Sequence, residues 1–204
     1  MLPEEIVPGL LRWSAPHPEW VERSTPAGPD DWGQMVGSVL YEVPPVVVLI
    51  DPLLPTDGRA EFLAWLDERV AGRPVSILTT IRWHRRDRKE LARRYAAGTS
   101  PRAWNAIPPG VQPRPLRGAG EIVMWLPGAA ALVCGDCLIA GGGRLSVCPE
   151  SWLADQRVDR QGLAALMLPL LELPIERVLV SHGEPVLHDG RAALSHALRE
   201  ASGD

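Results

Sequence analysis

The amino-acid sequence predicts an α/β fold in which two mixed β-sheets pack as a sandwich flanked by helices. In the first half of the chain, short apolar strand patterns alternate with amphipathic helical patterns. In the second half, two apolar strand patterns are separated only by Pro127-Gly128, which is typical of a hairpin turn. Hairpins interleaved with strand–helix units favour a two-sheet sandwich over a purely parallel sheet. With 204 residues, 46% of them hydrophobic, we expect one domain over residues 1–204.

Residues 1–34 are expected to be an irregular N-terminal segment rich in proline and tryptophan. Its prolines and tryptophans include Pro16, Pro18, Trp20, Pro26, Pro29 and Trp32. Because prolines at this density disfavour regular structure, we expect a long loop here. Residues 35–41 then alternate in polarity and predict a strand. The β-branched run Val46–Ile50, bounded by Pro45 and by Asp51-Pro52, predicts a strand buried on both faces.

The next stretch predicts two strand–helix units. Apolar residues recur at helical spacing over Arg59–Val70, with Gly72 after them as a stop signal. Residues 75–79 predict a short buried strand, and residues 87–97 predict an amphipathic helix. Residues 100–116 contain five prolines, which predicts an ordered loop around a short strand.

The last part of the chain predicts the second group of strands and helices. Glu121–Leu126 and residues 130–134 form the expected hairpin, and Gly141-Gly142-Gly143 predicts a flexible connection. A helix, a buried strand and a terminal helix are then expected at residues 161–171, 177–180 and 190–201.

Charge and hydropathy restrict the partners of the chain. Its 25 acidic and 21 basic residues give a net charge of −4, which favours neither nucleic acid nor an anionic membrane. No apolar run approaches the ~20 residues of a membrane-spanning helix. The start of the chain, with Glu4 and Glu5, is acidic where a secretory signal would be basic, so we expect a cytoplasmic protein. The sequence does not decide between a monomer and an oligomer.

Four groups of polar residues follow predicted buried strands, where functional groups of α/β folds gather. Asp51 follows the first, and its position before a proline favours a turn cap over a ligand. His84 and Asp87 follow the second, either as metal ligands or as a packed histidine beside a helix cap. Asp136 and His182 follow two later strands beside glycines, which favours a role in a site.

The three cysteines, Cys134, Cys137 and Cys148, are an odd number in one short stretch. This is a poor disulfide framework, so we expect reduced thiols. The spacing of Cys134 and Cys137 is compatible with a redox or zinc motif. A matching second pair is missing from the sequence, so we do not favour that interpretation.

Taken in order, the four strand ends resemble the metallo-β-lactamase superfamily, from about residue 35 to the last helix. The matching pieces are Val48-Leu-Ile-Asp51, Ile77-Leu-Thr-Thr80, Leu132-Val-Cys-Gly-Asp136 and Val180-Ser-His-Gly183. The resemblance implies an αββα sandwich with a metal centre at the strand ends. Asp136 then corresponds to the bridging aspartate, and His182 to the final histidine of the metal site.

The chain departs from that family at most of the implied metal ligands. The family motif Thr-His-x-His-x-Asp-His meets Thr80, Arg82, His84 and Arg85 at its ligand positions, and a further histidine aligns with Arg117. The candidate ligands that remain are His84, Asp87, Asp136 and His182. They are enough for a single divalent ion such as zinc, manganese or iron, or for none, so we do not expect a two-metal centre.

Three functions follow from these residues. The first is a divergent, non-dinuclear scaffold whose Arg82, Arg85 and Arg117 bind a small anion, with an arginine neutralising Asp136. The second is a one-metal hydrolase of an ester, thioester or lactone that uses Asp136, His182 and His84. The third is an acid–base pair of Asp136 and His182 that acts without metal.

Overall fold

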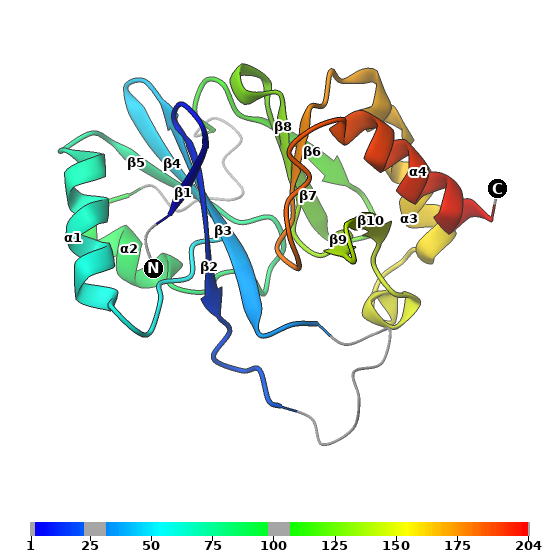
Figure 1. The fold of residues 1–204 in the computed structure, drawn as a ribbon, viewed down its shortest axis with the longest axis horizontal. Helices are drawn as coiled ribbons and strands as arrows, with labels where there is room; N and C mark the ends of the chain where they lie inside the picture. The colour runs from blue at the N-terminus through cyan, green and yellow to red at the C-terminus, as the bar shows by residue number, and fades with distance from the viewer. Residues whose placement is uncertain (1–2, 23–31, 98–106, 204) are drawn as a thin grey trace.

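The computed structural model describes residues 3–22, 32–97 and 107–203, and it shows two β-sheets packed face to face with helices outside both (Figure 1). The first sheet has the order β1-β2-β3-β4-β5. Its strands are Glu4–Val7, Leu10–Pro16, Met35–Val43, Val46–Ile50 and Val75–Leu78. β4 and β5 pair in parallel and the other neighbours pair antiparallel, so this sheet is mixed.

The second sheet has the order β11-β8-β7-β6. Its strands in that order are Arg177–Leu179, Ala131–Val133, Glu121–Leu126 and Gln112–Leu116. β11 and β8 pair in parallel, whereas the other pairs are antiparallel. The expected αββα sandwich of two mixed sheets is therefore confirmed.

Alternation along β4 shows how the layers form. Val48 and Ile50 lie in the core between the two sheets, whereas Val47 and Leu49 pack with Phe62 of helix α1 on the outer face. Successive side chains of a strand point to opposite faces, so a strand between two apolar layers reads as a continuous apolar run. This confirms the strand predicted as buried on both faces.

Two pairs of helices cover the sheets (Figure 1). Helix α1, Arg59–Val70, and helix α2, Arg88–Arg94, lie on the first sheet, and helices α3, Arg160–Met167, and α4, Gly190–Ser202, lie on the second. α3 is shorter than predicted and continues as the 3-10 segment Leu168–Glu172. The proline at position 169 explains this change, because it has no N–H for a helical hydrogen bond. Among the described residues, no helix is long and apolar enough to cross a membrane.

The prediction of a long N-terminal loop is wrong. Strands β1 and β2 occupy much of the segment, and β2 pairs with β3 along its whole length. Leu10 faces the core between the sheets, while Leu11 and Trp13 face α1. The prolines that suggested a loop include Pro16, which is the last residue of β2. Residues 23–31 lie outside the described part of the chain.

The glycine run after β8 is a hairpin turn instead of a flexible connection. Strands β9, Leu138–Gly141, and β10, Arg144–Val147, pair antiparallel around Gly142 and Gly143. Both glycines have positive φ, which a tight two-residue turn requires. In contrast, the short strand expected within residues 100–116 is confirmed as β6, and its prolines are tolerated because β6 is an edge strand. Residues 98–106 of that segment are not described.

Candidate metal centre

The ends of four strands meet at one edge of the sandwich. β4 and β5 are parallel neighbours, so Asp51 and Thr80 leave the first sheet side by side. β8 and β11 are parallel neighbours in the second sheet, with Val133 beside Leu179, so the chain reaches Asp136 and His182 at the same edge. The topology therefore brings together polar residues that are far apart in the sequence.

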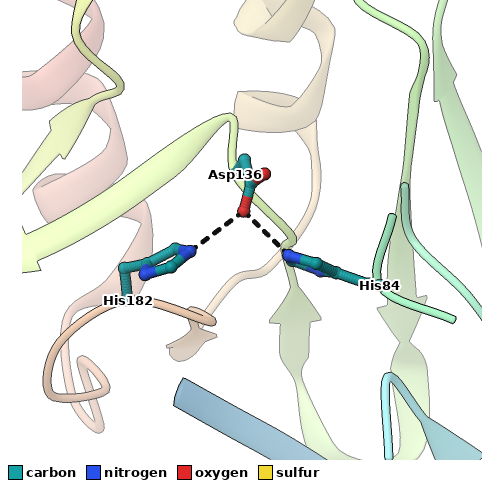
Figure 2. Close-up of side chains that lie close together, drawn as sticks. All are labelled: His84, Asp136 and His182. Carbon is teal, nitrogen blue, oxygen red and sulfur yellow. Dashed lines mark hydrogen bonds and ion pairs between the residues drawn. The ribbon is translucent and has the colours of Figure 1, made fainter. Parts of the chain in front are cut away.

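Asp136 lies between His84 and His182 (Figure 2). One carboxylate oxygen of Asp136, Oδ1, is 3.0 Å from Nε2 of His84 and 3.2 Å from Nε2 of His182. One potential ligand atom from each residue lies within 4.8 Å of the others. Two imidazole nitrogens and a carboxylate oxygen suit zinc, iron or manganese, so these three side chains could hold a metal ion.

His84 is buried and contacts a carboxylate through each ring nitrogen. Its Nδ1 lies 3.0 Å from Oδ2 of Asp51, while its Nε2 faces Asp136. Burial alone would lower the pKa of His84, but the two carboxylates raise it to about 9. The contact to Asp51 keeps a proton on Nδ1, so Nε2 is the nitrogen that would bind a metal ion on losing its own proton, as carboxylate–histidine pairs arrange in metal sites.

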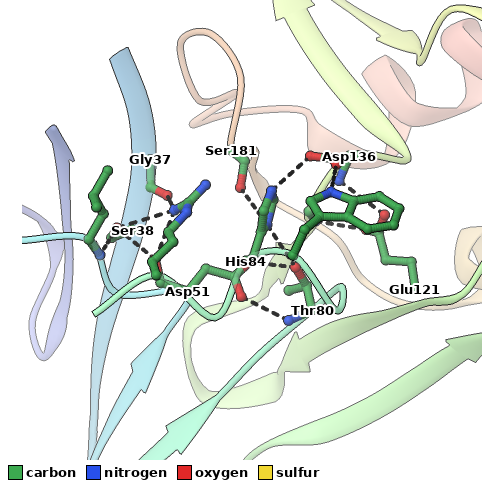
Figure 3. Close-up of polar contacts among 12 residues, drawn as sticks. Gly37, Ser38, Asp51, Thr80, His84, Glu121, Asp136 and Ser181 are labelled. Atoms are coloured by element: carbon green, nitrogen blue, oxygen red, sulfur yellow. Dashed lines mark hydrogen bonds and ion pairs between the residues drawn. The ribbon is translucent and has the colours of Figure 1, made fainter. Parts of the chain in front are cut away.

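Asp51 orients this histidine and does not act as a local turn cap (Figure 3). Its Oδ1 accepts the backbone N–H of Thr80 at 2.8 Å, and its Oδ2 accepts the Thr80 hydroxyl. Its backbone carbonyl accepts from Ser38 Oγ at 2.8 Å. The turn-cap interpretation favoured by the sequence is wrong, because the partners of the carboxylate lie on the neighbouring strand end and on His84.

Glu121 holds the loop that carries Asp136 and was not predicted (Figure 3). Its carboxylate accepts the backbone N–H groups of Gly135, Asp136 and Cys137 at 2.7, 3.0 and 2.8 Å. Burial and the charge of Asp136 raise the pKa of Glu121, whereas these hydrogen bonds oppose that shift. A Cβ at position 135 would lie 2.4 Å from Thr80 Oγ1, so only glycine fits. The sequence feature that could have indicated this role is the position of Glu121, an acidic residue at the start of an apolar strand.

The charge of Asp136 is compensated by aromatic donors. Burial would raise its pKa, but hydrogen bonds from His182 and His84 hold that pKa well below the usual range. Its other oxygen accepts from Nε1 of Trp83. Among the described residues no arginine forms an ion pair with Asp136, so the predicted direct neutralisation is wrong, although the charge of Arg86 acts on this carboxylate at longer range.

His182 sits on a turn that the first sheet and the β9–β10 hairpin restrain. Its backbone bridges to Val36 and Ile139, and Arg12 donates from Nη2 to the Gly183 carbonyl at 2.7 Å. Gly183 has a φ of 95°, and a Cβ there would lie 1.8 Å from the Ala140 carbonyl oxygen. The glycine after His182 is thus required by a close backbone approach, as its position suggested.

The imidazole of His182 is held mainly by ring packing. Its centroid lies 5.5 Å from Trp32 and 5.1 Å from Trp152, both in edge-to-face arrangements. Its Nδ1 is buried and has no hydrogen-bond partner among the described residues. Within the described part of the chain, Asp136 is therefore the one hydrogen-bond partner of the His182 side chain.

A cavity of about 350 Å³ opens over the three side chains and is called here the aromatic pocket. The described residues that line it are His17, Glu19, Trp32, Trp83, His84, Arg86, Asp136, Trp152 and His182. The pKa of His17 is lowered by burial and by the positive charge of Arg86. Indole rings therefore line the site, and the positively charged guanidinium of Arg86 lies beside them.

The other predicted site residues lie apart from the three side chains. Asp87 accepts the backbone N–H of Leu54 at 2.7 Å and pairs with Arg59, so it faces away from Asp136. The prediction of Asp87 as a ligand is wrong, because its carboxylate is used to join the start of α2 to the preceding loop.

The three arginines predicted to bind an anion do not line the pocket. Arg82, Arg85 and Arg117 are exposed, and the Arg82 guanidinium lies 5.3 Å above the ring of Trp83. The arginine of the pocket wall is Arg86, which has positive φ and turns inward. In the sequence Arg86 belongs to the same charge run as Arg82 and Arg85, and that run does not distinguish inward from outward side chains.

The cysteine prediction is confirmed. Cys134, Cys137 and Cys148 are free thiols and buried. Burial raises the pKa of Cys148 to about 12.

Comparison with solved structures shows the fold family. A metallo-β-lactamase from Erythrobacter litoralis matches with a TM-score of 0.64 and 15% identity, over 99% of this chain and 92% of that one. A mono-zinc form of an enzyme from the same organism gives 0.62 and 16%, over 99% and 96%. A metallo-β-lactamase from Pontibacter korlensis gives 0.57 and 16%, over 99% of both chains. No family model and no curated protein matches the sequence. The chain has the metallo-β-lactamase fold.

Proposed function

We propose that this chain with the metallo-β-lactamase fold is a hydrolase that works with one divalent metal ion on an ester, thioester or lactone. The observation that carries the proposal is the convergence of His84, Asp136 and His182, whose ligand atoms lie within 4.8 Å of one another. Two nitrogen donors and one oxygen donor are the kind of ligand set that hydrolytic metal sites use.

The three residues fit a metal by their surroundings as well as by their type. The two Nε2 atoms face one oxygen of Asp136, and Asp51 holds the opposite nitrogen of His84. Carboxylate support of a histidine ligand is a common feature of metal sites. Asp136 keeps a low pKa and so offers an ionised oxygen.

When bound, a metal ion supplies Lewis-acid polarisation of a carbonyl and activation of water near neutral pH. The protein residues supply position and environment. Asp51 keeps the Nδ1 proton of His84, and Glu121 fixes the loop that presents Asp136. The indoles of Trp32, Trp83 and Trp152 line the cavity and give it apolar walls.

The positions at which the family resemblance implies further ligands favour one metal over two. Thr80 uses its hydroxyl on Asp51, while Arg82 and Arg117 are exposed and cationic. Arginine does not ligate cations. A structural neighbour crystallised in a mono-zinc form indicates that the fold can hold one zinc in that protein.

A second candidate is a scaffold that binds a small anion without turnover. The observation in its favour is Arg86, a positively charged residue of the pocket wall. The metal-free acid–base pair is a third arrangement, since Asp136 and His182 are within hydrogen-bond reach. Metal content separates the hydrolase from the other two, and the effect of Asp136→Ala on any turnover separates the acid–base pair from the scaffold.

Metal content measured by plasma mass spectrometry tests the proposal. The protein is purified without chelator and loaded with zinc, manganese or iron. It is expected to retain about one equivalent of metal per chain, and the His182→Ala variant is expected to lose this metal. The exposed His188→Ala is the matched control. Metal-loaded chain should hydrolyse an ester, thioester or lactone in a screen. Absence of metal under every loading would rule the proposal out, and bound metal without turnover would favour the scaffold.

A further inference from the structure

His17 is a histidine of the aromatic pocket that the proposed reaction has not used. It follows β2 directly and lies between Pro16 and Pro18. Its backbone N–H donates to the carbonyl of Gln34 at 2.8 Å, and its own carbonyl accepts from Trp20 at 3.1 Å. Because both backbone groups are hydrogen-bonded, the chain that carries this imidazole is held at the pocket wall.

The contacts of the imidazole fix which of its nitrogens carries the proton. Nδ1 of His17 accepts the backbone N–H of Glu19 at 3.3 Å, so the proton of the neutral ring is on Nε2. Nε2 forms no hydrogen bond in the described part of the chain and, unlike Nδ1 of His182, keeps accessible surface. His17 therefore offers an unused N–H donor at the wall of the aromatic pocket.

The surroundings of His17 keep its ring neutral. Burial and then the positive charge of Arg86 lower the pKa of His17. Positive charge on His84 and on His182 acts in the same direction, whereas Glu19 raises the pKa. A histidine whose pKa lies below its ordinary value is uncharged at neutral pH, so it donates a hydrogen bond there without being a cationic acid.

His17 is placed to contact a bound molecule instead of the metal itself. The ligand atoms of His84, Asp136 and His182 lie within 4.8 Å of one another, and no such group within residues 3–22, 32–97 and 107–203 includes His17. Its ring packs edge to face on Trp32 at 5.1 Å, and Trp32 packs on His182 at 5.5 Å. One indole therefore connects His17 to the three side chains, and the cavity of about 350 Å³ separates them only by ligand space.

We propose that His17 is a further catalytic residue of the hydrolase and that its Nε2–H donates a hydrogen bond to the carbonyl oxygen of the substrate. The inference rests on the proposed function, because it assigns a role in that reaction. Addition of water to the carbonyl carbon moves the π electrons to this oxygen, which becomes negatively charged. Their return restores the carbonyl and breaks the bond to the leaving oxygen or sulfur, which takes up one proton of the water. The Nε2 proton stays on His17 throughout.

The tautomer of His17 is a first test that needs no turnover. Two-bond ¹H–¹⁵N spectra of the labelled full chain near neutral pH distinguish the two neutral tautomers from the charged ring. We expect a proton on Nε2 and none on Nδ1, with the resonances assigned by their absence from the spectrum of His17→Gln. A proton on Nδ1, or a charged ring at that pH, would overturn the proposal.

Two variants separate the hydrogen-bond donor from the aromatic packing. His17→Phe keeps a ring against Trp32 but has no donor, whereas His17→Gln keeps an N–H donor but has no ring. With a substrate found in the hydrolysis screen, kcat of His17→Phe should fall roughly 100- to 1,000-fold with little change in KM, as for loss of one donor to a developing oxyanion. His17→Gln should recover most of kcat, and the exposed His188→Ala should leave it unchanged. Recovery by phenylalanine and not by glutamine would assign His17 to packing and overturn the proposal.

Binding of phenylphosphonate provides a second test without turnover. Its tetrahedral anion resembles the substrate carbonyl after water has added, so it should accept the same hydrogen bond. In calorimetry with the zinc-loaded chain, His17→Phe is expected to bind it roughly 10- to 100-fold more weakly, as for loss of a hydrogen bond to a charged group. Equal affinities of the unchanged chain and His17→Phe would contradict the role of His17.

Zinc content separates failure of this proposal from failure of the hydrolase proposal. Both His17 variants should retain as much zinc as the unchanged chain, because His17 lies outside the ligand group. A chain that retains zinc and hydrolyses a substrate, but has equal kcat in His17→Phe, contradicts the role of His17 alone. A chain that retains no zinc contradicts the hydrolase proposal. The tautomer, and phosphonate binding by the metal-free chain, would then still decide whether His17 supplies the donor.

Discussion

His84 and His182 contact the same oxygen of Asp136, but the protein holds the two imidazoles in different ways. His84 is buried between two carboxylates, with Asp51 on its second nitrogen. His182 has one carboxylate contact, and its ring packs against the edges of Trp32 and Trp152. Electrostatic pairing therefore fixes one proposed ligand and aromatic packing fixes the other. Changing their neighbours should affect metal affinity to different extents.

The largest effect is expected from Asp136→Ala. This change removes the oxygen that both histidines face, so zinc affinity should fall by more than about 100-fold, beyond the loss usual for a supporting residue. A competition titration with a chromogenic chelator measures it. Zinc binding of unchanged strength in this variant would show that the two histidines do not share a site with Asp136.

Asp51→Asn tests the electrostatic side of the comparison. Loss of the supporting carboxylate should weaken zinc binding roughly 10- to 100-fold. Because the change breaks a buried pair with His84, it should also destabilise the metal-free chain by about 3–5 kcal/mol in urea unfolding. Asp87→Asn is the control, since that carboxylate contacts Leu54 and Arg59. Equal zinc affinities of the two variants would contradict the role given to Asp51.

Glu121→Gln tests the loop that carries Asp136, the carboxylate that both histidines contact. An amide has one acceptor oxygen where the carboxylate has two, so at least one of the three backbone N–H groups loses its partner. We expect a loss of about 1–3 kcal/mol in the free energy of unfolding. Zinc affinity should fall less than in Asp51→Asn. A melting temperature equal to that of the unchanged chain would be inconsistent with this function of Glu121.

Trp32→Leu tests the aromatic packing around His182 and should have the smallest effect on zinc affinity. An edge-to-face aromatic contact contributes about 0.5–1.5 kcal/mol, so zinc affinity should fall by less than roughly tenfold. The same chelator competition measures this change. If Trp32→Leu weakened zinc binding more than Asp51→Asn does, packing would be the dominant restraint and the comparison would be reversed.

The sequence predicted the strands that carry the site better than it predicted their neighbours. The run Val46–Ile50 has apolar residues on both faces, and the glycines beside Asp136 and His182 mark turns with close backbone approach. β1 was missed because it is short and begins with two glutamates, and β2 because Arg12 and Ser14 interrupt its apolar residues. β2 pairs with β3 and β1 pairs with β2, and a local sequence pattern does not contain these pairings.

The roles of charged residues were the least predictable part of the site. Arg82, Arg85 and Arg86 are chemically alike and close in sequence, yet only Arg86 of the three lines the aromatic pocket in the described chain. Arg86 differs from the other two by a positive φ, and no sequence period predicts such a backbone conformation. Glu121 was missed for a similar reason, since its partners are backbone groups of a distant loop.

The three converging side chains also connect the two halves of the sandwich. His84 follows β5 of the first sheet, whereas His182 follows β11 of the second and lies 46 residues beyond Asp136. An ion held by all three would act as a cross-link that closes long stretches of chain and restricts the unfolded ensemble. Loading with metal would then protect the chain from proteases and slow the separation of its sheets, whether or not any substrate is turned over.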